Sequence, residues 1–385
     1  MRSITILGST GSIGTQALET VSLHWEGLQV AALSAHHNAA LLFEQVRHYR
    51  PRMAALTGEK AEIPRDLRFC EWYFGRDALG IIAEHAPADD VLVSVSGMVG
   101  LRSVLAARKA GRRVLLANKE ALVAGGALVM AACPEVEGQP TLIPVDSEHS
   151  AVFQCLRAAD GNAFRRIILT ASGGPFRTFN KDQIRNASLR QALNHPNWSM
   201  GDKITIDSAS MFNKALEIIE AKWLFDAQPG QIEVLIHPQS IIHSMVCFED
   251  GAVLAQLGTP NMRIPIQYAM TYPRRLDSGL TPLDLADIGQ LSFEKPDTER
   301  FPAISLAYQA LHSGEGSACI LSAANEVAVA AFLRQEIRFG AITDIVTQTM
   351  QHLGAMKADS LEAVEEADRA ARQWAHAALA SHRDI

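Results

Sequence analysis

Short apolar runs alternate with helical patterns along the first 145 residues. The runs lie at residues 4–7, 28–33, 91–95 and 114–116, and helical patterns such as residues 101–110 separate them. Strands and helices that alternate in this way form a parallel sheet with helices on both faces. The first part of the chain is therefore predicted to be an α/β domain spanning residues 1–145.

The pattern changes after this domain. Strand-like runs at 141–145, 167–170, 234–236, 244–248 and 252–257 lie among helices and one long loop, 176–204, which has little periodicity. Long loops inside compact domains are usually functional or disordered. Charged residues, glycine and proline then dominate 272–302, and helical patterns fill the rest. We expect a second domain at 146–275, a linker at 276–300 and a helical domain at 301–385.

Composition narrows the class of protein. The 385 residues are 48% hydrophobic and 20% charged, as in soluble globular proteins. No apolar run approaches the roughly 18 residues of a membrane span, and residues 121–133 predict a buried helix. No export signal is evident, and the five scattered cysteines favour reduced thiols in the cytoplasm. A net charge of −7 without a basic block disfavours nucleic acid as a partner.

A glycine turn follows the first predicted strand. Its sequence, Gly8-Ser9-Thr10-Gly11-Ser12-Ile13-Gly14, leads into a helical run, which is the context that dinucleotide binding requires. A purely structural turn is the alternative. The second strand ends in Ser34-Ala35-His36-His37-Asn38, without the acid that holds an NAD ribose, so we favour NADP. The alternative is that His36 and His37 are solvated loop residues.

Carboxylates recur at two places. Asp146 and Glu148 would point to the same side of an extended segment, and a helix opening at Asp207 would carry Asn213, Lys214 and Glu217 on one face. Three carboxylates without cysteine suit Mg²⁺ or Mn²⁺. From spacing alone, a surface strand end and a helical ion pair remain the better-supported alternative.

Other polar segments could bind a phosphorylated ligand. Ser172-Gly173-Gly174 follows a strand and, with Ser208, Asn213 and Lys214, could form a phosphate pocket, although a tight turn explains it equally well. Trp198 and Met200 would serve either as hydrophobic anchors or as a lid. Asn118-Lys119-Glu120 lies at the carboxyl end of a strand, where ligands of α/β sheets collect. His237 and His243 are interpreted as structural.

Eight segments in register resemble the 1-deoxy-D-xylulose 5-phosphate reductoisomerase family. They lie at 8–14, 116–120, 144–149, 170–176, 195–201, 206–217, 236–240 and 257–263, and 323–326 extends the match. The resemblance implies an α/β fold with an N-terminal Rossmann-like parallel sheet, a central α+β catalytic domain with a mobile loop, and a C-terminal helical domain. It implies a cytoplasmic homodimer that reduces and rearranges this sugar phosphate to 2-C-methyl-D-erythritol 4-phosphate for isoprenoid biosynthesis.

The resemblance also implies roles for individual residues. The implied metal ligands are Asp146, Glu148 and Glu217. Catalytic roles fall to Lys119, Glu148, His195 and Glu217. Substrate contacts are implied for Lys119, Ser147, Glu148, Ser172, His195, Trp198, Ser208, Asn213, Lys214 and Glu217. NADPH contacts are expected at Thr10, Gly11, Ser12, Ile13, His37, Asn38, Asn118, Glu120 and Gly201.

One departure and two rival functions remain. Many family members have Gly or Ala and then Lys, Arg or Ser before Asn38, where this chain has His36-His37. The first rival function is a plain NADP-dependent dehydrogenase, which would need no metal. The second is a nucleotide sensor, which would bind NADPH without turnover.

Overall fold

The computed structural model describes residues 1–58, 60–198 and 200–382. The chain folds as two compact units. Unit 1 contains Met1–Ala121, Val129–Ser150 and Asn261–Thr281, and unit 2 contains Leu122–Leu128, Ala151–Pro260 and Pro282–Ile385. Residues 261–281 thus group with the N-terminal segment, and the helical tail groups with the central one. The four-part division inferred from the sequence stays a prediction.

Unit 1 is built on a parallel sheet. Among the described residues the sheet has seven strands in the order β4-β3-β2-β1-β5-β6-β7, and every neighbouring pair is parallel. The strands are β1 (Arg2–Leu7), β2 (Leu28–Ala35), β3 (Met53–Leu56), β4 (Glu71–Phe74), β5 (Asp90–Val93), β6 (Arg113–Leu116) and β7 (Leu142–Pro144). The predicted Rossmann-like sheet is confirmed. The strand order reverses between β1 and β5, which is where ligands of such sheets bind.

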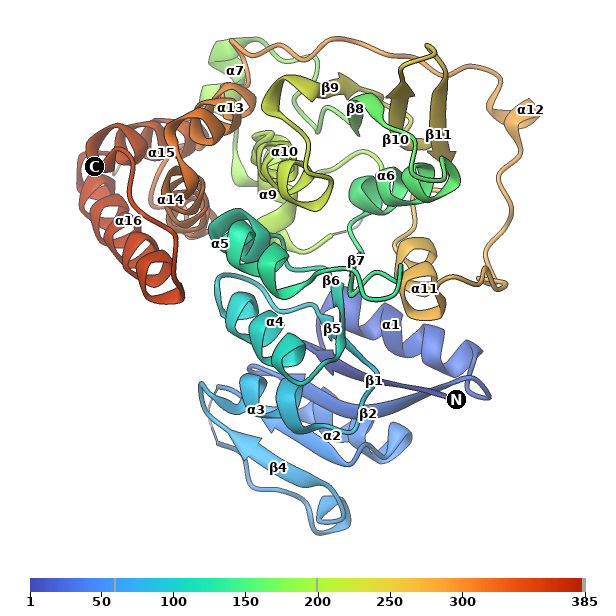
Figure 1. Ribbon diagram of the computed structural model, residues 1–385. Helices are drawn as coiled ribbons and strands as arrows, with labels where there is room; N and C mark the ends of the chain where they lie inside the picture. Colours follow the sequence, from blue (N-terminus) through green and yellow to red (C-terminus); the bar gives the residue numbers. More distant parts are fainter. Residues whose placement is uncertain (59, 199, 383–385) are drawn as a thin grey trace. The chain divides into compact units, whose positions relative to one another are not determined.

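Helices and one returning segment complete unit 1 (Figure 1). They are α1 (Ser12–Leu23), α2 (Ala39–Tyr49), the short η1 (Arg65–Leu67), α3 (Ala78–His85), α4 (Val99–Lys109), both ends of α5 (Lys119–Ala132) and α11 (Arg263–Thr271). Helix α11 returns to α1, where Arg263 pairs with Glu19 at 2.7 Å and Gln267 lies 3.0 Å from His24. These contacts explain why residues 261–281 belong to unit 1.

Unit 2 joins a smaller sheet to helices. The sheet order is β11-β10-β8-β9, and β8 and β9 are parallel. Its strands are β8 (Phe164–Ala171), β9 (Ile232–Ile236), β10 (Ile242–Phe248) and β11 (Val253–Leu257). The helices are α6 (Ser147–Ala158, whose first residues lie in unit 1), α7 (Lys181–Arg185), α8 (Leu189–Ala192), α9 (Asp202–Ala209), α10 (Phe212–Leu224), the short η2 (Pro229–Gln231), α12 (Leu285–Ile288), α13 (Ala303–Ser313), α14 (Glu315–Leu333), α15 (Phe339–Leu353) and α16 (Leu361–His382).

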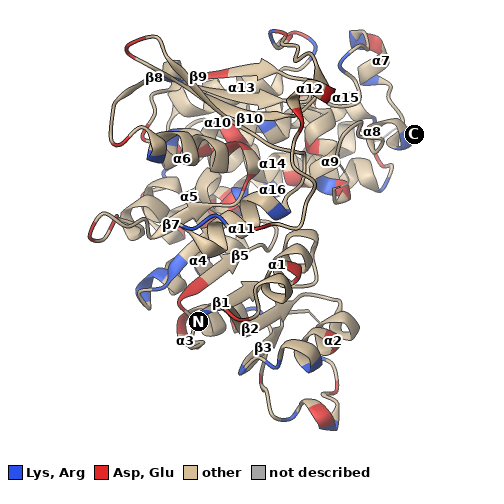
Figure 2. Ribbon diagram, turned by 90° about the vertical axis from the view of Figure 1, so that its right-hand side faces the viewer, with Lys and Arg blue, Asp and Glu red and all other residues tan. Residues whose placement is uncertain are grey.

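The predicted helical tail is confirmed, with α14 packed against α13, α15 and α16 (Figure 1). Helix α14 is the one described helix long and apolar enough to cross a membrane, but 83% of its most apolar window is buried inside the fold. Burial of that kind is typical of a core helix in a bundle. Acidic and basic residues are interspersed over both units (Figure 2).

Two expectations about the secondary structure of unit 2 are wrong. Residues 176–204 are not one loop, because capping boxes at Asn180/Gln183 and Ser188/Gln191 start the short helices α7 and α8. Residues 207–217 are not one helix, because α9 ends at Ala209 and Met211 adopts a left-handed φ of 64° before α10 begins. Both features are local, and the hydrophobic pattern does not register them.

Candidate functional site

The glycine turn lies at the strand-order reversal of unit 1. It leads from β1 into α1, whose N-cap Gly11 provides no side-chain hydrogen bond to the first turn. A Cβ at Gly14 would lie 2.3 Å from the Gly8 carbonyl oxygen, so only glycine lets the turn close this tightly. Gly11 and Ser12 are exposed. Exposed N–H groups at a helix start attract phosphate through hydrogen bonding and the helix dipole.

The end of β2 carries the three residues considered for the 2′-phosphate. His36, His37 and Asn38 are all exposed. His36 Nδ1 lies 2.8 Å from the Thr57 hydroxyl oxygen, and the ring centroids of His36 and His37 are 3.9 Å apart. The Asn38 side-chain oxygen accepts a hydrogen bond from the Leu41 N–H and thereby caps α2. His37 is therefore the more available of the two imidazoles for a ligand.

Asn118 organises the carboxyl end of β6. Its oxygen caps α5 at the Ala121 N–H, while its nitrogen donates to Val95 O, Gly97 O and the Glu120 carboxylate at 2.9–3.0 Å. Asn118, Lys119 and Glu120 are all buried. The Asn118 side chain thus orients Glu120 and the start of α5, a structural role that its sequence position did not reveal.

Asp146 and Glu148 follow β7, but the extended segment expected for them is wrong. Helix α6 begins at Ser147, because the Asp146 carboxylate accepts hydrogen bonds from the backbone N–H groups of Glu148 and His149 at its start. Lys119 forms an ion pair with Asp146, and the Ser147 hydroxyl donates to Glu148. Asp146, Ser147 and Glu148 are only partly buried, so both carboxylates keep solvent access.

Helix α10 of unit 2 carries the third predicted carboxylate. Glu217 is fully buried and accepts hydrogen bonds from the Asn213 amide and the Lys214 ammonium, which confirms that the three share one helix face. Lys214 is itself 3% exposed. A buried pair of this kind is poor evidence for a contribution to stability, which favours a functional explanation.

Ser172 and His195 meet in unit 2. His195 Nε2 lies 3.1 Å from the Ser172 hydroxyl oxygen, which also accepts from the Gly174 N–H. Gly174 has a φ of 65°, and a Cβ there would lie 2.9 Å from the Ser208 carbonyl oxygen. The fold thus brings three predicted phosphate-binding residues to one turn. Burial lowers the pKa of His195, which favours its neutral form.

The structure also describes the other residues of the 194–201 segment except residue 199. The ring centroid of Trp198 lies 6.3 Å from that of His243, and the Trp198 side chain is partly buried. Gly201 is the exposed N-cap of α9. Ser199, part of the quoted 195–201 motif, lies outside the described residues. His237 has both ring nitrogens in hydrogen bonds, to Ser292 O and from the Ile241 N–H, which supports its structural interpretation.

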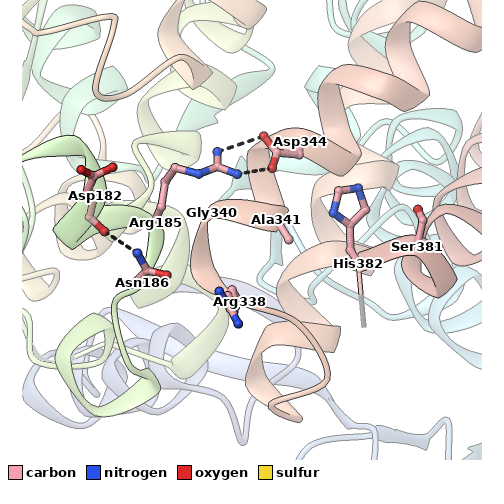
Figure 3. Close-up of a pocket in the computed structure, with 9 residues that line it drawn as sticks. All are labelled: Asp182, Arg185, Asn186, Arg338, Gly340, Ala341, Asp344, Ser381 and His382. Atoms are coloured by element: carbon pink, nitrogen blue, oxygen red, sulfur yellow. Dashed lines mark hydrogen bonds and ion pairs between the residues drawn. The ribbon is translucent and has the colours of Figure 1, made fainter. Parts of the chain in front are cut away.

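A polar cavity of about 350 Å³ lies elsewhere in unit 2 (Figure 3). It is bordered by α7, α15 and the end of α16, and an Arg185–Asp344 pair at 2.7 Å closes one side. None of the predicted site residues lines it. Its position marks where α7 docks on the helical end, so it is not the candidate site.

Sequence reasoning missed several residues that support the site. The Asn197 amide binds the turn after β9, and the buried Asp207 pairs with Lys203 at 2.9 Å and accepts from Asn325 at 2.7 Å. No pattern identifies the partners of Asn197 and Asn325, since they are far apart in the chain, whereas Lys203 and Asp207 have the i,i+4 spacing of a helical ion pair. Asn197 and Asn325 each lie in a motif quoted above, but a motif does not say what a side chain touches.

Three family models match consecutive parts of the chain. They describe 1-deoxy-D-xylulose 5-phosphate reductoisomerase, at residues 4–126, and two C-terminal domains of that enzyme, at residues 142–225 and 257–374. The chain is 51% identical over 395 residues to the enzyme of that name from Cupriavidus necator, with 100% of both chains covered. It is 49% identical to the one from Phocaeicola vulgatus, covering 99% of this chain and 100% of that one.

Solved structures agree with this likeness. A reductoisomerase from Zymomonas mobilis in complex with NADPH is 41% identical, with a TM-score of 0.89 and 99% of each chain covered. A second, in complex with NADPH, fosmidomycin and magnesium, is 38% identical with a TM-score of 0.90, covering 99% of this chain and 98% of that one.

Proposed function

The chain belongs to the 1-deoxy-D-xylulose 5-phosphate reductoisomerase family, and from this premise we propose which of its residues perform the family reaction. That reaction is the NADPH-dependent rearrangement and reduction of 1-deoxy-D-xylulose 5-phosphate to 2-C-methyl-D-erythritol 4-phosphate, in isoprenoid precursor biosynthesis. One observation carries the proposal. The glycine turn, Asn118–Glu120 and Asp146 all follow carboxyl ends of strands in one parallel sheet.

The glycine turn is the proposed NADPH site. The uncapped start of α1 offers its N–H groups to the pyrophosphate, and the proposed contacts are Thr10, Gly11, Ser12, Ile13, His37, Asn38, Asn118, Glu120 and Gly201. Gly14 lets the turn pack closely against the start of α1, which keeps these N–H groups near the proposed pyrophosphate position. His37 would approach the 2′-phosphate of NADP, since the His36 ring is already bound to Thr57.

Asp146, Glu148 and Glu217 are the proposed ligands of Mg²⁺ or Mn²⁺. The donor chemistry fits, because each offers carboxylate oxygens, and Asp146 and Glu217 each pair with a lysine, Lys119 and Lys214. The five cysteines are all buried free thiols, so no soft ligand competes. When bound, the cation polarises the substrate ketone as a Lewis acid, and NADPH supplies the hydride.

The turn and helices of unit 2 are the proposed substrate phosphate site. Ser172, His195, Ser208, Asn213 and Lys214 supply hydroxyl, imidazole, amide and ammonium groups, which suits a phosphate dianion. Lys119 and Ser147 would contact the sugar backbone, and Trp198 would cover the substrate and exclude water. Binding energy gained at the phosphate, away from the reacting carbons, helps to position them.

We propose that the protein works as a cytoplasmic homodimer. Strand β11 is an edge of the smaller sheet, and its Val253 and Leu254 are 50% and 39% exposed. An exposed apolar edge strand is a surface on which a second copy can pair. The buried free thiols suit a reducing compartment.

The test follows NADPH absorbance with 1-deoxy-D-xylulose 5-phosphate and Mg²⁺, with and without EDTA. We expect oxidation of NADPH that EDTA abolishes and excess Mg²⁺ restores, with the branched product identified by mass and NMR spectroscopy. Oxidation that survives EDTA would favour a plain dehydrogenase. Tight NADPH binding without any oxidation would favour a sensor.

A further inference from the structure

We propose that Asn197 is a positioning residue that acts through His195. Its side chain ties the backbone of residues 197–198 to the turn between β9 and β10, and this tie decides which nitrogen of the His195 ring carries the proton. The inference rests on the proposed role of His195 at the substrate phosphate.

Both hydrogens of the Asn197 amide are used. The side-chain nitrogen donates to the Pro238 carbonyl oxygen and, at 3.1 Å, to the Ser240 hydroxyl oxygen. Ser240 is 8% exposed, and Asn197 is partly buried. Two hydrogen bonds from one amide to one turn fix both the position and the direction of the chain at residue 197.

The turn that receives Asn197 is itself held firmly. His237, fully buried, lies 3.0 Å from Ser292 O through Nδ1 and accepts the Ile241 N–H through Nε2 at 3.1 Å. Its ring stacks on Phe293 with the centroids 4.9 Å apart. The segment predicted to be a linker therefore braces the turn to which Asn197 is tied.

The anchored backbone acts on His195. The N–H groups of Asn197 and Trp198 both donate to His195 Nδ1, at 3.2 and 3.0 Å. A nitrogen that accepts two hydrogen bonds carries no proton, so the neutral ring is protonated at Nε2.

Ser172 then receives two hydrogen bonds. The His195 Nε2–H donates to the Ser172 oxygen, which also accepts from the Gly174 N–H. The hydroxyl proton of Ser172 is thereby left to donate to a substrate oxygen. If the Asn197 anchor is lost, Nδ1 loses its two donors and the Ser172 hydroxyl loses its fixed direction.

The test compares Asn197→Asp with Asn194→Asp. The first is isosteric but has no amide donor and places a carboxylate against the Pro238 carbonyl oxygen, while Asn194 is an exposed asparagine in the same segment. We expect Asn197→Asp to raise the KM for 1-deoxy-D-xylulose 5-phosphate about tenfold, to change kcat by less than about threefold, and to leave the Kd for NADPH unchanged. Asn194→Asp should match the wild type in all three.

Two further measurements separate the inference from a merely structural role and from the proposed function. The ¹⁵N shifts of the His195 ring, assigned with His195→Gln, should report protonation at Nε2 in the wild type and a tautomer mixture in Asn197→Asp. Unchanged shifts, or an unchanged KM, would overturn the inference even if His195→Gln raises the KM. If His195→Gln itself leaves the KM unchanged, the proposed phosphate site fails as well.

Discussion

Glu217 is a carboxylate with no exposed surface, and its nearest cation, Lys214, is almost as deeply buried. Taking such a pair out of water costs free energy that hydrogen bonds and mutual attraction roughly offset. A sequence that needed only stability would place apolar residues at both positions. At the scale of the residue, the pair is best explained by what Glu217 is proposed to bind.

Glu217→Gln tests that explanation. The amide keeps the shape of the side chain but removes the charge that a hard cation requires. We expect Mn²⁺ affinity, measured by electron paramagnetic resonance on the protein without substrate, to fall by about tenfold to a hundredfold, and turnover at limiting Mg²⁺ to fall at least as far.

The matched control is Glu233→Gln, which alters an exposed ion pair with Arg166 in the same unit. It should bind Mn²⁺ as the wild type does. If Glu217→Gln binds Mn²⁺ with wild-type affinity, Glu217 is not a ligand.

At the scale of the element, the turn between β1 and α1 depends on how closely the backbone packs. Gly14 is the third residue of α1, and its Cα lies against the Gly8 carbonyl oxygen and the backbone of Ser9. Both neighbours are backbone atoms, which cannot rotate away as a side chain can. The shape of the cradle is therefore set by the absence of one methyl group.

Gly14→Ala should enlarge the turn and weaken NADPH binding. Overpacking against backbone commonly costs about 1–3 kcal/mol, so we expect the Kd, measured by NADPH fluorescence, to rise about tenfold. Gly80→Ala, in the middle of α3 with no atom within 4 Å of the new Cβ, is the control. That variant should keep the wild-type Kd and gain a little thermal stability.

At the scale of the whole molecule, the parallel sheet of unit 1 separates stability from function. Its carboxyl ends carry the proposed ligand groups, whereas its amino ends carry a buried ion pair between Asp90 and Arg113, with two hydrogen bonds of 2.8 and 2.9 Å. Asp90 is 2% exposed, and Arg2 approaches it at 3.5 Å. Burial raises the pKa of Asp90 even though both arginines oppose the rise.

Arg113→Met should destabilise the fold while leaving the ligand sites intact. Breaking a buried pair costs about 3–5 kcal/mol, which urea unfolding followed by circular dichroism would detect. Without Arg113 the pKa of Asp90 rises further above its unfolded value of about 3.9, so the loss is largest at neutral pH and shrinks as pH falls through the folded pKa.

Lys109→Met, which removes an exposed partner of Glu84, is the comparison and should change stability little. A loss in Arg113→Met that does not depend on pH would show that Asp90 is not the group responsible. A changed Kd for NADPH at temperatures where the variant is folded would show that the two edges are not independent.

The sequence predicted the elements better than their contacts. Periodicity identified β1, β2, β5 and β6, but it missed β3, whose sequence is Met-Ala-Ala-Leu, and β4, a partly exposed edge strand with the sequence Glu-Trp-Tyr-Phe. The motifs correctly placed Asn213, Lys214 and Glu217 on one helix face, since that depends on local spacing alone. The pairing of Ser172 with His195 and the anchor at Asn197 arise from tertiary packing, which no local spacing specifies.

A mutation near Asn325 could alter the proposed substrate site without changing a residue that contacts the substrate. Its amide holds Asp207, 118 residues earlier in the chain, and Asp207 directly precedes Ser208. Substitutions along α14 can therefore shift α9 and alter how the Ser208 region grips a ligand without changing any residue that touches it. Substitutions in this buried helix could therefore give resistance to a competitive inhibitor. A survey limited to residues that contact the inhibitor would overlook them.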